Sequence, residues 1–452
     1  MKLMIILFFM AGCLQGIAAN YYCDASSTNK TANGTLAAPW KNIAQVNSGT
    51  TMVNGGDTIF FKRGQTYVGR LYILRSGSAG NPIVYTAYGK GSLPTFDNTI
   101  SDIITLNNQT YVVIDRIKFI DNSLIDKLHQ LQATISNAIL LYNSPHCSIS
   151  NCDFSMLGIG IATFTGSNYT NITGNYMHNL RMVRNTPVYN NNNDDYGAVP
   201  IVIGSSSNTI SHNLFEECWA ISYDYGYDGG AIEFFGEDMN NNFIAYNTAI
   251  NCNGFIEIGS SSNGVAKNNV VAYNKIINCG MLGVFQNGGD YACNISNLQY
   301  YNNTIVETLR QFSVPGQLFY MAGSKGPAGM VVMKNNIFWC SNGTIIAGKK
   351  FNSSAMIRSN NIYRMSTGSL GAISLGANEY FSTSAGIFTA VSGSPSIWNY
   401  TLPVGSVGID FGVRVGLNND FKGNPIVGNP DAGIYEYAPS ASPRKKLLKR
   451  KN

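Results

Sequence analysis

The sequence predicts an all-β protein built as a parallel β-helix, a solenoid of short stacked strands. The first observation is a repeat, in which short apolar segments end in Asn through the middle of the chain. The clear copies end at Asn151, Asn175, Asn213, Asn247 and Asn274. The second observation is composition, with 47 Gly against 14 Pro and only 12% charged residues. Such a composition suits turn-rich β structure and excludes a coiled coil or a disordered chain.

The physical properties of asparagine explain this repeat. Each unit supplies short strands separated by turns, and Asn tolerates the left-handed backbone that a tight turn requires. When coils stack at about 4.8 Å, the side chain can also bond to its counterpart in the next coil. Insertions at turns do not disturb such a stack, so uneven spacing is expected. We therefore expect Asn213, Asn247 and Asn274 to form one column.

The rest of the chain supplies the ends of the solenoid. Before the clear repeats, apolar segments at 58–62, 83–87, 103–106 and 111–114 predict further strands under an N-terminal cap. From about residue 365 the Asn signal fades, and Gly, Ser and aromatic residues dominate. This part is expected to hold the final coils and an irregular C-terminal end.

The cysteines follow the same repeat. Cys218, Cys252 and Cys279 each come five residues after a repeat Asn, and no C-x-x-C motif occurs. A zinc site is therefore not indicated. We predict a column of small, buried, unpaired thiols; the alternative is disulfides, which an exported protein would allow.

The two termini differ from the body of the chain. Residues 1–19 are typical of a signal peptide, because Lys2 precedes a short apolar run and small residues up to Ala19. This predicts a secreted protein, extracellular or periplasmic, with a single β-helix domain at 20–438. The segment ending at Cys13 resembles a lipobox, which offers an alternative. In that case the protein would be an outer-surface lipoprotein, anchored to the membrane through a lipid on Cys13. Residues 439–452 form a basic tail that is expected to be disordered.

The charge distribution excludes one class of partner. The formal net charge is +5, but it becomes −2 without Lys2 and the six cations of the tail. The body therefore carries no basic surface typical of a nucleic-acid-binding protein. The protein is separately expected to be a monomer.

Several motifs resemble those of a known superfamily. They lie at 21–24 (Tyr-Tyr-Cys-Asp), 38–43 (Ala-Pro-Trp-Lys-Asn-Ile), 423–426 (Gly-Asn-Pro-Ile) and 430–437. Over most of the mature chain they resemble the secreted right-handed parallel β-helix proteins of the pectate-lyase-like superfamily. The resemblance implies a right-handed helix and a polysaccharide or oligosaccharide partner. It does not imply one reaction, because that superfamily contains lyases, glycosidases, epimerases and non-catalytic proteins.

Two glutamates form the candidate catalytic pair. Three successive coils align at 231–236, 255–259 and 284–288, with Ile232, Ile256 and Phe285 pointing inward. Alternation then predicts one outward column made of Glu233, Glu257 and Gln286, with Val202 in the coil before. Acids about 5 Å apart raise each other's pKa, and retaining glycosidases use such a pair. Asp228, just before the Glu233 strand, is expected to assist catalysis.

An enlarged coil beside this pair supplies candidate substrate contacts. The segment 219–229 is inserted before the Glu233 strand, whereas the next coil has almost nothing there. Aromatic faces stack on sugar rings and carboxylates bond hydroxyls, so we predict substrate binding by Asp224, Tyr225, Tyr227, Phe235, Phe255 and Gln286. A second insertion at 181–199 brings Arg181, which could pair with an acidic sugar.

The sequence therefore predicts a glycoside hydrolase with catalytic residues Glu233, Glu257 and Asp228. One alternative is a polysaccharide lyase using Arg181, Lys267 or Lys275. In lyases resembling chondroitinase B, a catalytic Lys follows a Glu-x-x-Ser strand; here Glu257 to Ser260 is similar, but Ser262 takes the place of that Lys. Another alternative is a non-catalytic glycan-binding protein. No cofactor is expected, unless Asp228, Glu233 and Glu257 hold a structural Ca²⁺.

Overall fold

The computed structural model describes residues 18–97, 102–121, 137–187, 193–309, 316–323, 326–351, 354–384 and 386–438. The predicted signal peptide, apart from its last two residues, and the predicted basic tail lie outside the described residues. Within the described ranges, no helix is long and apolar enough to cross a membrane.

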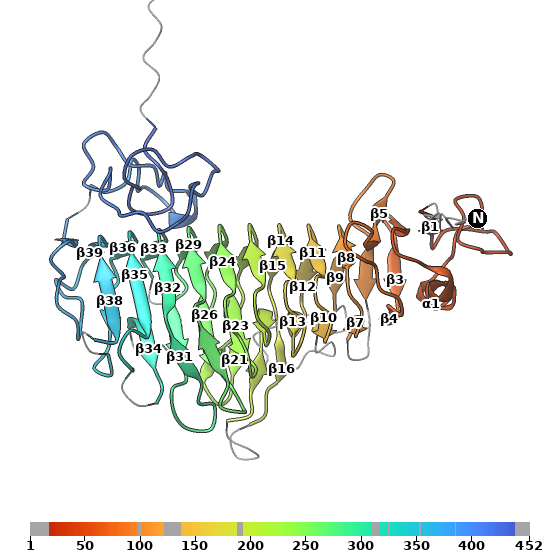
Figure 1. Ribbon diagram of the computed structural model, residues 1–452, viewed down its shortest axis with the longest axis horizontal. Helices are drawn as coiled ribbons and strands as arrows, with labels where there is room; N and C mark the ends of the chain where they lie inside the picture. The colour runs from red at the N-terminus through yellow and green to blue at the C-terminus, as the bar shows by residue number, and fades with distance from the viewer. Residues whose placement is uncertain are drawn as a thin grey trace, which may run out of the picture.

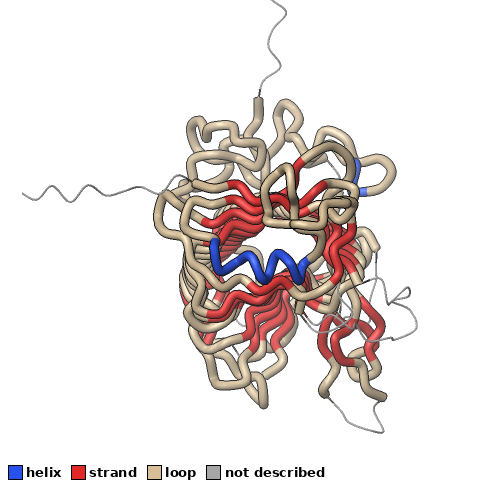
Figure 2. Tube along the Cα trace, turned by 90° about the vertical axis from the view of Figure 1, so that its right-hand side faces the viewer, coloured by secondary structure: helices blue, strands red, loops and turns tan. Residues whose placement is uncertain are grey.

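Three long parallel sheets form a right-handed β-helix, as predicted (Figure 1). Each turn of the solenoid adds one strand to each sheet, and every pairing within the three sheets is parallel. Viewed along its axis, the solenoid is a stack of coils with strands on its sides (Figure 2).

The first sheet has twelve strands: β1 (Asn20–Cys23), β2 (Thr58–Lys62), β5 (Ile83–Tyr88), β8 (Val112–Asp115), β11 (Ser148–Ser150), β14 (Asn171–Thr173), β19 (Thr209–Ser211), β24 (Phe243–Ala245), β28 (Val270–Ala272), β32 (Leu298–Tyr301), β35 (Val331–Lys334) and β38 (Met356–Ser359). The second has ten: β4 (Leu71–Tyr72), β7 (Ile104–Asn107), β10 (Asn137–Tyr142), β13 (Ile159–Thr163), β18 (Val199–Ile203), β23 (Ile232–Phe235), β26 (Ile256–Gly259), β30 (Gly283–Phe285), β34 (Gln317–Met321) and β37 (Ile345–Ala347).

The third sheet also has twelve strands: β3 (Thr66–Val68), β6 (Thr95–Asp97), β9 (Lys118–Ile120), β12 (Asp153–Ser155), β15 (Tyr176–His178), β20 (Leu214–Glu216), β25 (Thr248–Ile250), β29 (Lys275–Ile277), β33 (Thr304–Glu307), β36 (Ile337–Cys340), β39 (Ile362–Met365) and β40 (Tyr380–Ser382). Three small pairs lie outside these sheets: β16 (Met182–Arg184) with β17 (Tyr196–Gly197), β21 (Ala220–Ser222) with β22 (Gly226–Asp228), and β27 (Val265–Lys267) with β31 (Asn294–Ser296). The early strands predicted at 58–62, 83–87, 103–106 and 111–114 all exist, with ends within one residue of those expected.

The predicted asparagine column is confirmed. The Nδ2 of Asn213 donates to Oδ1 of Asn247, and Asn247 donates in the same way to Asn274, each at 3.0 Å. The ladder starts at Asn175 and continues through the weaker sequence copies, at Asn303, Asn336 and Asn361. All of these side chains are buried. Each amide thus satisfies polar groups that the interior would otherwise leave unpaired.

One asparagine of the repeat lies outside this ladder. Asn151 occupies a left-handed turn (φ 53°), and its Nδ2 donates to Asp115 at 2.8 Å. The next residue, Cys152, takes the ladder position instead, because its backbone N–H donates to Oδ1 of Asn175 at 2.9 Å. The first apparent copy was therefore misaligned by one residue.

The predicted thiol column is also confirmed. Cys218, Cys252 and Cys279 are buried and form no disulfide, and each thiol donates to the backbone carbonyl two residues before it. The eight described cysteines are all buried and form no disulfide, while Cys13 lies outside the described residues.

The segments at the two ends of the chain pack on different parts of the solenoid. At the N-terminal end, α1 (Ile43–Gly49) lies across the opening of the coils (Figure 2), followed by the 3-10 turn η1 (Thr50–Met52). Asn42 caps α1 by accepting the N–H of Gln45 at 3.0 Å. At the other end, the segment 386–438, which contains η2 (Pro395–Ile397), folds back along the side of the solenoid (Figure 1).

Candidate active site

Glu233 and Glu257 are direct partners on adjacent strands of the second sheet. The parallel register of β23 and β26 places them opposite each other, and Val202 of β18 precedes Glu233 in the same column. Both glutamates are partly exposed, while Ile232 and Phe234 on either side of Glu233 are buried. The backbone hydrogen bonds of the sheet therefore hold the two residues on neighbouring strands, whose backbones lie about 4.8 Å apart.

The predicted position of Gln286 is wrong by two residues. Val284, not Gln286, lies opposite Glu257, and Phe285 pairs with Ile258. Gly283 lies opposite Ile256, and a Cβ at Gly283 would lie 2.6 Å from the Phe285 ring. Gln286 follows the end of the strand and still reaches the acid pair, because its Nε2 donates to Oε1 of Glu257 at 3.0 Å.

Asp228 approaches the same two glutamates from an inserted hairpin. The predicted insertion at 219–229 is an antiparallel pair, β21 with β22, in which Ala220 lies opposite Asp228. The carboxylate of Asp228 accepts the N–H of Gly229 at 2.7 Å. The charge of Glu257 raises the pKa of Asp228, and Asp228 and Glu257 both raise the pKa of Glu233, so the three acids form one electrostatic cluster.

Burial and crowding raise the pKa values of this cluster. Desolvation raises the pKa of Asp228 to about 8, and the charge of Glu257 adds to the effect. Glu233 is raised to a pKa of about 8, chiefly by desolvation and then by Glu257 and Asp228. Desolvation also raises the pKa of Glu257, but the hydrogen bond from Gln286 favours its ionised form. Within the pair, the hydrogen bond from Gln286 therefore favours Glu257 over Glu233 as the ionised member.

An aromatic bridge that the sequence did not predict stands beside the acids. Tyr225 donates its hydroxyl to Oδ1 of Asn193 at 2.6 Å, and Tyr291 donates to the backbone carbonyl of Asn193 at 3.2 Å. The Tyr291 ring lies 6.1 Å from that of Phe235. Asn193 and Tyr291 come from separate turn insertions, and only the length of those insertions could have drawn attention to them.

The other predicted contact residues have different environments. Tyr227 is partly buried against Trp219, with ring centroids 5.8 Å apart. Phe255 was expected to point outward, but it is fully buried in the core. Gly254, at φ +121°, turns the chain just before the strand, so simple alternation does not extend to Phe255.

Arg181 is also not the exposed groove residue that was predicted. It is 4% exposed, and its Nη1 donates to the carbonyl of Asn179 at 3.0 Å. Desolvation lowers its pKa, against the opposing effect of Asp121. Arg181 thus supports the base of the 181–199 insertion.

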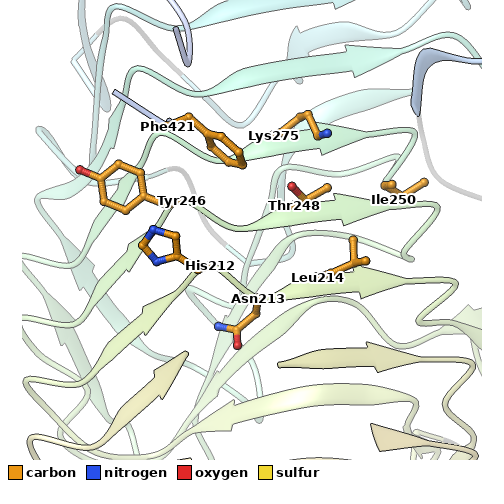
Figure 3. Close-up of a pocket in the computed structure, with 8 residues that line it drawn as sticks. All are labelled: His212, Asn213, Leu214, Tyr246, Thr248, Ile250, Lys275 and Phe421. Carbon is orange, nitrogen blue, oxygen red and sulfur yellow. The ribbon is translucent and has the colours of Figure 1, made fainter. Parts of the chain in front are cut away.

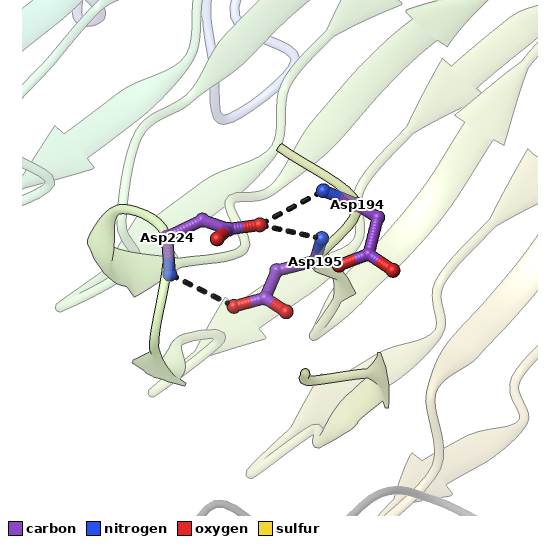
Figure 4. A group of neighbouring side chains, drawn as sticks. All are labelled: Asp194, Asp195 and Asp224. Atoms are coloured by element: carbon purple, nitrogen blue, oxygen red, sulfur yellow. Dashed lines mark hydrogen bonds between the residues drawn. The ribbon is translucent and has the colours of Figure 1, made fainter. Parts of the chain in front are cut away.

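A separate acidic triad lies beside the two hairpins (Figure 4). One oxygen from each of Asp194, Asp195 and Asp224 lies within 4.8 Å of the others, so these three could hold a metal. The predicted Ca²⁺ ligands Asp228, Glu233 and Glu257 do not form such a group in the described chain. The triad already accepts internal bonds: the backbone N–H groups of Asp194 and Asp195 donate to Asp224, and Asp224 N–H donates to Asp195.

Comparison with solved structures identifies the fold. The pectate lyase Pel9A matches with a TM-score of 0.58 and 15% identity, over 94% of this chain and 97% of that chain. A complex of XylC with xylose matches with a TM-score of 0.57 and 9% identity, over 92% and 98%. The chain has the pectate-lyase-like β-helix fold. Identities this low show the fold alone, and neither a scan against protein-family models nor a search of curated proteins gives a match.

Proposed function

We propose that this protein is a glycoside hydrolase acting on a polysaccharide, with Glu233 and Glu257 as its catalytic pair. The observation that carries the proposal is their direct pairing on β23 and β26, together with raised pKa values. A protonated acid beside an ionised one is the arrangement that retaining glycosidases require. The fold is shared with a pectate lyase and with a protein bound to xylose, which is consistent with a carbohydrate substrate.

The surroundings suggest a role for each acid. Glu233 remains protonated near neutral pH and is suited to protonate the leaving glycosidic oxygen. Glu257, oriented by Gln286, is suited to attack the anomeric carbon as a carboxylate. Asp228, with a pKa of about 8, keeps the local charge low by retaining its proton, which helps Glu257 to stay ionised.

The lyase alternative has weaker support in the described chain. A β-elimination needs a base and a positive or hydrogen-bonding group at the substrate carboxylate, and none of the groups that shift the pKa values of the acid cluster is a cation. Arg181 is buried, and Lys275 lies in the third sheet rather than the second. Lys267 is exposed on β27, in a separate two-stranded pair.

Export completes the proposal. A protein that degrades polysaccharides must meet them outside the cytoplasm, and residues 1–19 have the features of a signal peptide. We propose cleavage at Ala18 or Ala19 and release of the β-helix as a soluble protein.

The decisive experiment compares products and variants. Purified protein is incubated with a panel of neutral and acidic polysaccharides, and both reducing ends and ultraviolet absorbance are measured. We expect new reducing ends without the absorbance of an unsaturated sugar. Glu233→Gln and Glu257→Gln should each lower turnover by about 10²–10⁴-fold, whereas Glu237→Gln, an exposed site after the same strand, should have no effect. An unsaturated product would establish a lyase, and full activity in both active-site variants would exclude the glutamate pair.

A further inference from the structure

A second concave site lies on a different side of the solenoid, away from the glutamates. There the segment 386–438 packs on the outward face of the third sheet; the Phe388 ring, for example, stacks 5.5 Å from that of Trp339. The apolar contacts of this cover include Ile277 of β29 and, at its edge, Ile250 of β25, while Leu214 of β20 and Thr248 of β25 line a pocket beside it. Figure 1 shows the cover on the edge of the solenoid opposite to hairpin β21–β22. The edge of the cover therefore forms a step against the sheet.

A pocket of about 430 Å³ occupies this step (Figure 3). Its floor is a row of directly paired residues on adjacent strands: Leu214, Thr248 and Lys275. Phe421 of the C-terminal segment forms one wall. The pocket is completed by His212, Asn213, Tyr246 and Ile250.

Lys275 is the unusual member of this pocket. Its side chain is partly buried, and desolvation lowers its pKa. No hydrogen bond or ion pair joins its ammonium to another described residue; the Tyr400 ring lies 6.0 Å away. By contrast, Lys62 pairs with Asp24 at 2.7 Å. A desolvated cation without a counter-ion, at the edge of an apolar pocket, is suited to bind an anionic group from outside.

The walls of the pocket are aromatic and held in place. The Tyr246 ring stacks between those of His212 and Tyr273, at 5.2 and 5.7 Å. The Tyr246 hydroxyl donates to the carbonyl of Asn419 at 3.3 Å, which joins this row of stacked rings to the C-terminal segment. The Phe421 ring and the aliphatic side chains of Leu214 and Ile250 suit the C–H surface of a sugar, and the Thr248 hydroxyl can bond a sugar hydroxyl.

We propose that this pocket is a second, non-catalytic site that binds one carboxylate-bearing sugar residue. Lys275 pairs with the sugar carboxylate, and the Phe421 ring contacts the sugar ring beside the edge of Tyr246. This site would hold a polysaccharide chain on a face distant from the acid pair. The inference rests on the proposed function only in taking the ligand to be a carbohydrate.

The test is a calorimetric titration of the full chain with D-glucuronate, D-glucose and inorganic phosphate. We expect glucuronate to bind saturably and more weakly as salt increases. Lys275→Met, which keeps the length of the side chain, should weaken glucuronate binding at least tenfold. The control is Lys422→Met, because Lys422 follows Phe421 in the same segment but lies over the Tyr435 ring at 4.3 Å. Phe421→Ala should also weaken glucuronate binding, and it serves as the second variant if Lys275→Met does not fold.

Several results would overturn the proposal. Unchanged affinity in both Lys275→Met and Phe421→Ala would remove the pocket as the binding site. Glucose binding as tightly as glucuronate would deny the role of the lysine, and phosphate binding as tightly would indicate a simple anion site. Glucuronate binding at this pocket should persist in Glu233→Gln and Glu257→Gln, so a failure of the hydrolase proposal would be seen separately, as full turnover in those variants.

Discussion

Replacing Glu233 by Gln should stabilise the protein at pH 8 and leave its stability unchanged at pH 4. The folded state raises the pKa of Glu233 from 4.5 to about 8. Below pH 4 the carboxyl is protonated in both the folded and the unfolded chain, so it contributes no difference. As the pH rises to 8, the unfolded chain releases this proton first, and the folded state therefore loses stability. Gln stays neutral and removes that loss.

The expected change in the free energy of unfolding follows from the change in the pKa of Glu233 on folding. A displacement from 4.5 to about 8 corresponds to at most about 5 kcal/mol. Glu233 is partly exposed and its pKa depends on the charge of Glu257, so solvent and coupling reduce this value. We expect Glu233→Gln to raise the free energy of unfolding by about 2 kcal/mol at pH 8 and by about zero at pH 4.

Urea unfolding of both proteins at several pH values between 4 and 8 measures this difference. The matched control is Glu237→Gln, which removes an exposed carboxyl just after the same strand. A Glu233→Gln difference that is flat across this range, or that becomes more destabilising toward pH 8, would refute the argument that crowding and burial disfavour the charged carboxylate.

Four further predictions concern the scaffold and its ends. Asn247→Ala should lower the free energy of unfolding by about 3 kcal/mol, because it leaves buried ladder partners above and below without bonds; a chemical denaturation curve measures it. The eight cysteines from Cys23 to Cys340 should be inert to Ellman's reagent in the native protein and should all react in guanidinium; rapid native labelling would contradict their burial. Asp195→Ala should lower the melting temperature with or without EDTA, because its carboxylate accepts bonds from Thr186 N–H, Ser222 Oγ and Asp224 N–H; an effect seen only with added Ca²⁺ would indicate a metal site instead. Mass spectrometry of the exported protein should give Ala19 as the first residue, because the Ala19 nitrogen lies 2.7 Å from buried Asp57 and its new ammonium would pair there; a lipidated Cys13 would contradict this.

The features that follow from the period of the repeat could be predicted from the sequence. The features that depend on the register of one strand or on one backbone turn could not. The Asn column could be predicted because each copy has the same turn and the same bonding partner one coil away. The register at Gln286 could not, because a shift of two residues keeps every side chain on the same face and alternation does not distinguish the two registers. The inward position of Phe255 depends on the backbone of Gly254, which alternation does not describe.

The part of the candidate site that lies within strands could be predicted from the sequence, because the strands have a regular period. The part that lies on inserted turns could not. Glu233 and Glu257 lie within strands, where the period of two fixes the face of each side chain. Asp228 and Tyr225 lie on an inserted hairpin, and the sequence showed that this insertion exists but not how it folds. The hydrogen bond of Tyr225 depends on Asn193, which comes from another insertion. Such contacts arise only when separate coils are stacked in three dimensions.

The position of the acid pair within a sheet is itself an argument for function. Two carboxyls that cost stability would move apart if they were on flexible loops, and a surface pair without a role gains nothing from their proximity. Here the backbone bonds of β23 and β26 fix their spacing, and the buried side chains of Ile232 and Phe234 prevent Glu233 from rotating away. The asparagine ladder on another side of the same coils supplies the rigidity that opposes the repulsion. A scaffold that holds two acids together at a cost in stability is what differential protonation of a catalytic pair requires.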